Sequence, residues 1–273
     1  MSETSYSIVI PVRVDPLIDR AIESIPGGAE IIVGFSASPD WFIAGLKERY
    51  GERLIYVEAR GTGMPAALNV AVQNATNEKI IVLDSDCYLR SDETITAYLS
   101  GLDQAPFIRG VTLMEKNGFW SKIASKGTES LNTKFENNPR LFGPSIAFNK
   151  SSFLRYGGYD LNMINGSCDH EFSLRIEKNK ERIDFAPQAV IIHKPLTFKT
   201  DIISHLGYGK GMAYIDWKHT GNYGLHICLE RLYPATLLDK LYGRGGFSVF
   251  RSILLGIIML FGYRNFKRNY ESK

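Results

Sequence analysis

The sequence predicts an α/β fold in which a mostly parallel central sheet is covered by helices on both faces and followed by a helical tail. Two observations lead to this prediction. Short runs rich in Val and Ile alternate with helix-like segments through the first half of the chain, and these runs are almost continuously apolar. Strands that are apolar on both faces are typical of parallel sheets buried between helices.

The first half supplies four strands and three helices in alternation. Turn residues mark the second helix, where Ser38 is suited to cap it, Pro39 to open its first turn and Gly51 to end it. Ligands of such sheets bind beyond the carboxyl ends of the strands, so we expect a site there. The predicted strands are 6–12, 30–36, 53–59 and 79–84, and the predicted helices are 15–25, 38–51 and 64–75.

After residue 105 the alternation becomes less regular. We interpret this part as an extension of the same sheet and not as an independent domain, because it contains no long Gly/Ser linker. Strands are predicted at 106–115, 143–149 and 182–193, and helices at 119–132 and 170–180.

Composition bounds the class of protein. The chain has 273 residues, of which 44% are hydrophobic and 22% charged, as in an ordinary soluble globular protein. Its cysteines, Cys87, Cys168 and Cys228, are odd in number and have no CxxC spacing, which argues against a disulfide scaffold or a zinc site. The start of the chain lacks the pattern of a signal peptide, so a cytoplasmic location is expected.

The C-terminal tail is basic and partly apolar. From residue 240 onward there are seven basic residues against one acidic residue, and Arg251 and Arg264 bracket the apolar run Ser252–Tyr263. That run is shorter than the ~20 residues needed to cross a bilayer. One interpretation is a helix lying on the cytoplasmic face of an anionic membrane. The other is a buried C-terminal helix or an oligomer contact, and the sequence leaves both open.

Two carboxylates end the fourth predicted strand. Alternate residues of a strand share a face, so Asp84 and Asp86 are expected to point the same way. Like charges so placed repel unless a cation lies between them, and Mg²⁺ or Mn²⁺ suits carboxylate oxygens. The alternative is that Asp86 only caps the next turn.

Two later segments offer further candidates. If a helix begins near Asp169, its dipole favours a carboxylate there, and Glu171 and Arg175 can pair four residues apart. Asp169 could equally be an N-cap, and the pair could be surface support. His193 ends a strand and is either a third metal ligand or a hydrogen-bonded histidine.

Taken together, these segments resemble the nucleotide-sugar-dependent glycosyltransferases of family 2, which have the Rossmann-like GT-A fold. The resemblance covers roughly residues 5–215 and rests on the order of four segments: "SIVIPVR", "GMPAALNVAVQNATNEKIIVLDSD", "GPSIAFNKSSFLRYGGYD" and "CDHEFSLRI". It implies a glycosyltransferase domain at 1–225, with a nucleotide-binding half at about 1–105 and an acceptor half at about 106–225. The remaining residues, 226–273, form the tail.

The resemblance also implies roles for individual residues. Asp169 would be the general base, supported by Glu171 and Arg175. A divalent metal, Mn²⁺ or Mg²⁺, would be held by Asp86, Asp84 and His193. The donor-binding residues would be Pro11, Val12, Arg13, Arg60, Asp84 and Ser85.

The chain departs from the family pattern in two places. Gly34, Phe35 and Ser36 stand where an acidic turn usually helps to hold the nucleobase, and Phe35 is a candidate to stack on the base instead. Cys168 replaces the acidic residue ahead of the base, while the base position itself is kept. The identity of the nucleotide is therefore left open.

The implied function is transfer of a sugar, with inversion, from a nucleotide-diphosphate donor to a hydroxyl acceptor such as a glycan or a lipid-linked saccharide. An anionic membrane surface is a further candidate partner, and no nucleic acid is expected. One rival is a non-catalytic nucleotide-sugar-binding protein. The other is a metal-dependent sugar nucleotidyltransferase, which would normally show a Gly-rich basic loop where this chain reads "PVRVDPLIDR".

Overall fold

The structure is a computed structural model that describes residues 5–134, 136, 139–141, 143–163, 166–221 and 246–271. The chain forms two compact units. The first contains Met1–Leu113, Asn132–Ile164 and Cys168–Lys194, and the second contains Met114–Leu131, Asn165–Ser167 and Pro195–Lys273.

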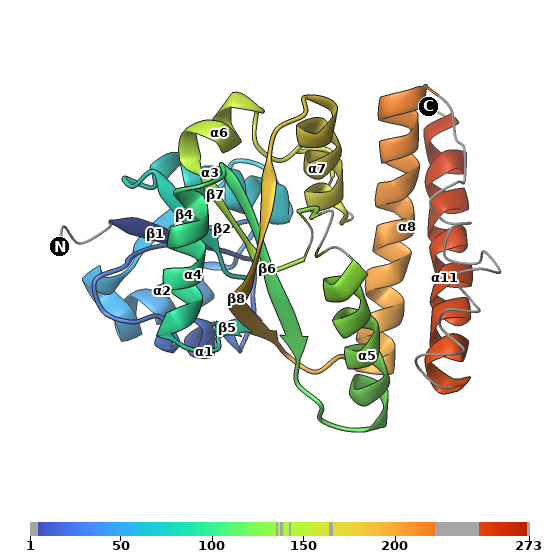
Figure 1. The fold of residues 1–273 in the computed structure, drawn as a ribbon, viewed down its shortest axis with the longest axis horizontal. Coiled ribbons are helices and arrows are strands. Elements are labelled where there is room, and N and C mark those ends of the chain that lie inside the picture. Colours follow the sequence, from blue (N-terminus) through green and yellow to red (C-terminus); the bar gives the residue numbers. More distant parts are fainter. Residues whose placement is uncertain are drawn as a thin grey trace. The chain divides into compact units, whose positions relative to one another are not determined.

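The first unit is built on a mixed sheet with the strand order β3-β2-β1-β4-β7-β6-β8-β5 (Figure 1). The strands from the start of the chain are parallel: β1 pairs with β2 and β4, and β2 pairs with β3. β7 runs antiparallel to β4 and β6, and β5 runs antiparallel to β8. The α/β prediction is thus confirmed. The strands are β1 Tyr6–Val12, β2 Glu30–Phe35, β3 Ile55–Glu58, β4 Lys79–Val82, β5 Cys87–Leu89, β6 Phe107–Met114, β7 Ile146–Asn149 and β8 Ile183–His193.

Helices of the first unit cover this sheet and close an apolar core. Ile8, Ile10 and Val33 on the central strands are completely buried, as expected for strands covered on both faces. α4, between β5 and β6, is absent from the sequence prediction although it buries Ile95, Tyr98 and Leu102. The helices are α1 Ile18–Glu23, α2 Asp40–Tyr50, α3 Met64–Asn74, α4 Asp92–Leu102, α6 Lys150–Arg155 and α7 Cys168–Lys178, and a 3₁₀ turn, η1, spans Gly51–Arg53.

The start of α2 differs from the prediction in one detail. Pro39 is the N-cap residue, and the Ser38 hydroxyl donates to the Val12 carbonyl at 3.4 Å instead of capping the helix. Gly51 ends the helix with φ 50°, as the sequence predicts.

The second unit is helical and contains α5 Phe119–Lys134 up to Leu131, α8 Phe198–Thr220 and α11 Gly246–Glu271. α8 begins with a capping box between Thr197 and Thr200. α8 and α11 lie side by side (Figure 1). A side chain at Gly209 would overlap the Met259 carbonyl oxygen, so the two backbones meet where only glycine fits.

Polar contacts also join these helices. Arg251 of α11 donates from Nε and Nη2 to the buried Asp201 of α8 at 2.7 and 2.9 Å. The Tyr263 hydroxyl donates to Asp216 at 2.6 Å. Trp120 of α5 donates its indole N–H to the same Asp201 at 2.9 Å. One face of α11 is therefore packed against protein.

α11 is longer than the apolar run Ser252–Tyr263, which by itself is too short to cross a bilayer. The helix spans 26 residues, and its segment Val249–Lys267 is long and apolar enough to cross a membrane by length and composition. Core helices of soluble proteins share these properties, so length alone does not decide between a spanning, an interfacial and a packed helix.

Candidate active site

A pocket of about 460 Å³ lies at the carboxyl ends of β1 and β2, beside the N-terminus of α3. This volume falls within the range of ~300–1,000 Å³ typical of small-molecule sites. Arg60 is exposed in the segment between β3 and α3 and is not among the residues that line the pocket. The lining residues are Pro11, Val12, Arg13, Ser36, Ala37, Thr62, Gly63, Met64, Ala67 and Ser85.

The N-terminus of α3 gives the pocket a preference for anions. Gly63 is its N-cap residue, and Thr62, Gly63 and Met64 all line the pocket. The first amide groups and the dipole of a helix favour negative charge at this end. Sequence reasoning missed these residues, although Gly63 followed by Met64-Pro65 is a recognisable helix start.

Phe35 does not line the pocket, so it is not available to stack on a base there. The ring is 1% exposed, lies parallel to Tyr56 at a centroid distance of 6.3 Å and meets Phe42 edge-on at 6.5 Å. Packing requires glycine at position 34, because any side chain there would overlap the Ala67 carbonyl oxygen of α3. The close approach of β2 to α3 therefore excludes a carboxylate at residue 34.

Asp84 and Asp86 lie in the turn that joins β4 to β5, not within a strand. β4 ends at Val82, and the Cys87 amide donates to the Asp84 carbonyl at 3.0 Å to close the turn. The alternation of strand faces is therefore not what brings the two carboxylates together. Asp84, Ser85 and Asp86 are all half-buried.

The charges of Asp86 and Asp169 affect the ionisation of Asp84. Burial raises the pKa of Asp84 to about 7, with the charges of Asp86 and Asp169 adding to the effect and Lys194 opposing it. Burial also works against ionisation of Asp86, but His193 and Lys194 outweigh it and hold the pKa of that carboxyl below its usual value. Negative charge at this edge is in excess, which favours a bound cation.

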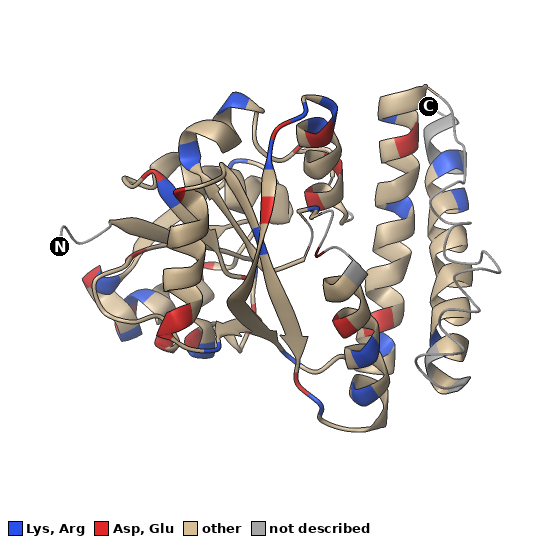
Figure 2. Cartoon of the chain, in the orientation of Figure 1, with Lys and Arg blue, Asp and Glu red and all other residues tan. Residues whose placement is uncertain are grey.

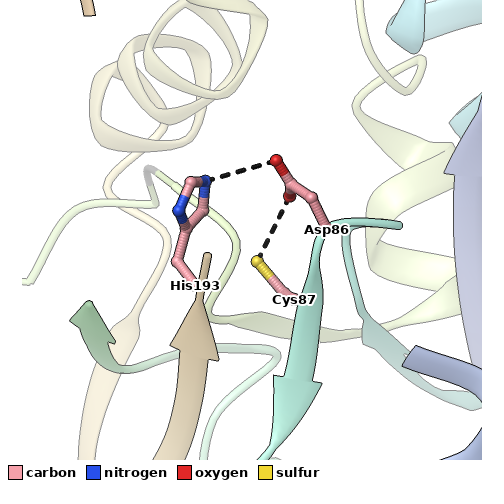
Figure 3. A group of neighbouring side chains, drawn as sticks. All are labelled: Asp86, Cys87 and His193. Atoms are coloured by element: carbon pink, nitrogen blue, oxygen red, sulfur yellow. Dashed lines mark hydrogen bonds and ion pairs between the residues drawn. The ribbon is translucent and has the colours of Figure 1, made fainter. Parts of the chain in front are cut away.

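The side chains around Asp86 are suited to a divalent metal. Asp86, Cys87 and His193 can each offer one ligand atom, and these atoms lie within 4.8 Å of one another (Figure 3). His193 Nε2 lies 3.5 Å from Asp86 Oδ2, and the Lys194 ammonium lies 3.0 Å from the same oxygen. Carboxylate and imidazole donors fit Mn²⁺, and the lysine neutralises part of the charge.

Asp169 lies in the first turn of α7, one residue inside the helix, and not at the N-cap. Its Oδ2 accepts a 2.6 Å hydrogen bond from the Gly143 amide, and its Oδ1 accepts one of 2.8 Å from the His170 amide. Gly143 belongs to the segment before β7, for which the residues alone indicate no role. That segment therefore orients the Asp169 carboxylate.

Glu171 and Arg175 form the expected pair, but the pair is buried on the glutamate side. Glu171 is 0% exposed, and Arg175 Nε lies 3.0 Å from each of its carboxylate oxygens. Arg175 also donates to the carbonyls of Tyr156 and Gly158, the latter at 2.6 Å. The pair thus ties α7 to the turn after α6 and is more than surface support.

Arg109 is a residue that sequence reasoning missed. It lies on β6 and is 1% exposed, and burial lowers its pKa to about 10 although Tyr98 and Asp169 oppose the effect. A side chain on Gly143 would come within 3.9 Å of Arg109 Nη1, so this cation lies behind the peptide that holds Asp169. A single arginine inside the apolar run "FIRGVTLM" was the available signal.

Comparison with known proteins decides the family. Residues 7–157, more than half of the chain, match the model of glycosyl transferase family 2. The chain belongs to glycosyl transferase family 2. The resemblance inferred from the ordered segments is confirmed, and so is the expectation of a glycosyltransferase enzyme. A comparison with curated proteins finds no match.

Solved structures of glycosyltransferases share the fold of this chain. A mannosyltransferase from Pyrobaculum calidifontis, in complex with GDP-Man and Mn²⁺, has a TM-score of 0.61 and 17% identity over 92% of this chain and 73% of its own. TarS residues 1–349 from S. aureus have a TM-score of 0.52 and 13% identity, over 98% of this chain and 91% of theirs. The same TarS segment with UDP-GlcNAc has a TM-score of 0.54 and 13% identity, covering 98% and 92%. At these identities the likeness establishes the GT-A fold alone.

Proposed function

We propose that this family 2 enzyme transfers a sugar, with inversion, from a nucleoside-diphosphate donor to a hydroxyl acceptor on a glycan or a lipid-linked saccharide. The observation that carries the proposal is the anion-favouring pocket, which Ser85 helps to line. Ser85 lies between Asp84 and Asp86 in the sequence, and the charges of Asp86 and Asp169 both act on Asp84. The GDP-Man and UDP-GlcNAc complexes of the two fold neighbours support a nucleotide-sugar donor.

The pocket binds the nucleotide part of the donor in this proposal. Pro11 and Val12 supply the wall at the end of β1, and the exposed Arg13 supplies a positive charge. The N-terminus of α3 at Gly63 favours the diphosphate. Arg60, which is exposed three residues ahead of Gly63, would contact a phosphate that extends beyond the pocket.

Asp86 and His193, with Asp84 beside them, would hold a divalent cation, Mn²⁺ or Mg²⁺. When bound, such a cation neutralises negative charge on a diphosphate leaving group. Asp84 is the carboxylate whose ionisation is disfavoured, so it gains most from added positive charge. Lys194 would remain close enough to Asp86 to share in that neutralisation.

Asp169 acts as the general base. It takes the proton of the acceptor hydroxyl while the acceptor oxygen bonds to the anomeric carbon and the bond from that carbon to the diphosphate oxygen breaks. Attack from the side opposite the leaving group inverts the configuration. The amides of Gly143 and His170 hold the carboxylate, and Glu171 with Arg175 fixes the helix that carries it.

A peripheral contact with an anionic membrane completes the proposal. Phe247, Phe250, Ile257 and Phe261 are 66%, 59%, 42% and 60% exposed, and their spacing puts them on one face of α11. No charged residue lies between Arg251 and Arg264 (Figure 2). An exposed apolar helix face beside basic residues is suited to the membrane interface. The opposite face packs on α8, which favours an interfacial over a spanning helix.

The first experiment is a thermal-stability titration with UDP-, GDP- and TDP-sugars, with and without Mn²⁺. We expect one nucleotide class to stabilise the protein, and more strongly when the cation is present. Stabilisation without sugar transfer to any of a panel of glycan and lipid-linked acceptors would favour the non-catalytic binding protein. No stabilisation by any donor would refute the donor site.

A further inference from the structure

A sulfur atom lies in the candidate metal site, beside the oxygen and nitrogen donors. β5 and β8 run antiparallel with Cys87 directly opposite His193, so both side chains point to the same face of the sheet (Figure 3). Asp86 precedes Cys87 and lies in the turn that leads into β5. The three side chains thus converge although 105 residues lie between Cys87 and His193 in the sequence.

One ligand atom of each side chain lies within 4.8 Å of the other two, close enough to share one ion. The Cys87 thiol donates a 3.5 Å hydrogen bond to Asp86 Oδ1, and His193 Nε2 lies 3.5 Å from Asp86 Oδ2. A tetrahedral zinc ion with Zn–S of ~2.3 Å and Zn–N of ~2.0 Å puts neighbouring ligand atoms roughly 3.5 Å apart. The side chains therefore need little rearrangement to meet such an ion.

The ring of His193 is held in the tautomer that a metal requires. Its Nδ1 lies 2.7 Å from the Lys194 carbonyl oxygen, which can only accept, so Nδ1 carries the proton. In the neutral ring Nε2, which lies 3.5 Å from Asp86 Oδ2, is then the nitrogen available to a metal. A histidine that ligates a metal through one nitrogen typically donates from the other in this way.

We propose that Cys87 is a ligand of this metal site, and that Asp86, Cys87 and His193 together bind Zn²⁺ or Co²⁺ in preference to Mg²⁺. The inference rests on the proposed metal role of Asp86 and His193 and adds the thiolate. Sulfur is a soft donor that zinc and cobalt accept and magnesium avoids. The thiol proton passes to solvent as the sulfur–metal bond forms.

A consequence for the enzyme follows from this ligand set. Zn²⁺ would compete with Mg²⁺ at Asp86, so the identity of the bound cation would depend on zinc supply as well as on the donor. Cys87 is 1% exposed, which protects its sulfur from solution oxidants but leaves it next to a half-buried carboxylate.

Cobalt spectroscopy on the full-length C168S/C228S variant tests the inference, because Cys87 is then the one remaining thiol among the three cysteines of the sequence. Co²⁺ gives visible d–d bands when bound by protein ligands and an additional near-ultraviolet sulfur-to-cobalt band when a thiolate coordinates. We expect both at one equivalent, with the sulfur band lost in C87A/C168S/C228S. We also expect C87A to weaken Co²⁺ and Zn²⁺ binding by about tenfold or more while Mg²⁺ binding stays unchanged.

The outcomes distinguish the role of Cys87 from the metal role of Asp86 and His193. Visible bands without a sulfur band would overturn the role of Cys87 and leave the Asp86–His193 site standing. Absence of any cobalt signal above that of a D86A/H193A variant would overturn both. If C87A does not fold, the sulfur band of the single-thiol protein decides the question by itself.

Discussion

The Gly143 amide donates a 2.6 Å hydrogen bond to Oδ2 of Asp169, which ties the segment before β7 to the first turn of α7. A backbone donor fixes the carboxylate without adding a competing charge. It also limits the rotation of the side chain. The reactivity of Asp169 is the first property to test.

Replacing Asp169 by Asn removes the base and keeps the shape. We expect kcat to fall by roughly 10²–10⁴-fold, because a positioned base contributes that much to proton transfer. Donor affinity, measured by calorimetry, should stay within about twofold of the wild type if the base touches only the acceptor. Asp103→Asn, at an exposed carboxylate, is the matched control. Equal loss of donor binding would refute the assignment.

Asp86→Ala removes the proposed cation ligand. We expect donor binding to lose its dependence on Mn²⁺, with affinity in the presence of Mn²⁺ reduced by about tenfold or more. Calorimetric titration of the donor with and without the cation measures this directly. Binding that still responds to Mn²⁺ as in the wild type would exclude Asp86 from the metal site.

Gly34→Ala tests the close contact between β2 and α3. A methyl group there overlaps the Ala67 carbonyl, so we expect the free energy of unfolding to fall by about 1–3 kcal/mol. Urea denaturation measures the loss. Gly27→Ala is the control, because a Cβ at Gly27 meets nothing within 4 Å. Equal stabilities of the two variants would contradict the packing argument.

Asp201 should make stability depend on pH in the acid range. Burial raises its pKa, but hydrogen bonds and charge from His205 and Arg251 outweigh that effect and hold the pKa below its ordinary value. A lowered folded-state pKa means stabilisation that is complete above the unfolded-state pKa and is lost as pH falls through the folded-state value.

Asp201→Asn should therefore lower the free energy of unfolding by about 3 kcal/mol at neutral pH. The difference from the wild type should shrink below about pH 4. Urea denaturation as a function of pH measures both, and a constant difference would refute the argument.

The exposed face of α11 should govern attachment to vesicles. We expect Phe250→Glu/Phe261→Glu to reduce co-sedimentation with anionic liposomes, because carboxylates replace apolar side chains that would enter the interface. Leu161→Glu, at a residue 56% exposed in the first unit, is the control and should bind as the wild type does. Unchanged binding by the α11 variant, or no binding by the wild type, would exclude this surface as the membrane contact.

Much of the first unit could be predicted because its strands are nearly continuous apolar runs. β1, predicted at residues 6–12, has those limits in the structure, and α2 ends at the predicted Gly51. α4 was not predicted although its apolar residues have helical spacing, because no element was assigned between the predicted strands 79–84 and 106–115. The predicted end of β4 was two residues late, since a turn bond to the Asp84 carbonyl competes with strand pairing.

The candidate site also contains residues that the sequence predicts and residues that it does not. Pro11, Val12, Arg13 and Ser85, for which the resemblance implies donor binding, line one pocket because they end or follow strands that meet at one edge of the sheet. Arg109 was not predicted, since its burial depends on elements that are far away in the sequence.

The sequence by itself determined the α/β class, the family and the order of its segments, because hydrophobic periodicity and local motifs are properties of neighbouring residues. Only the tertiary structure decided that Phe35 belongs to the core, that Gly143 holds Asp169 and that Cys87 meets His193. The cysteine spacing argued against a zinc site because it compares positions along the chain. Antiparallel pairing of β5 with β8 brings the sulfur and the imidazole together across the sheet, and no local pattern records which strands will become neighbours.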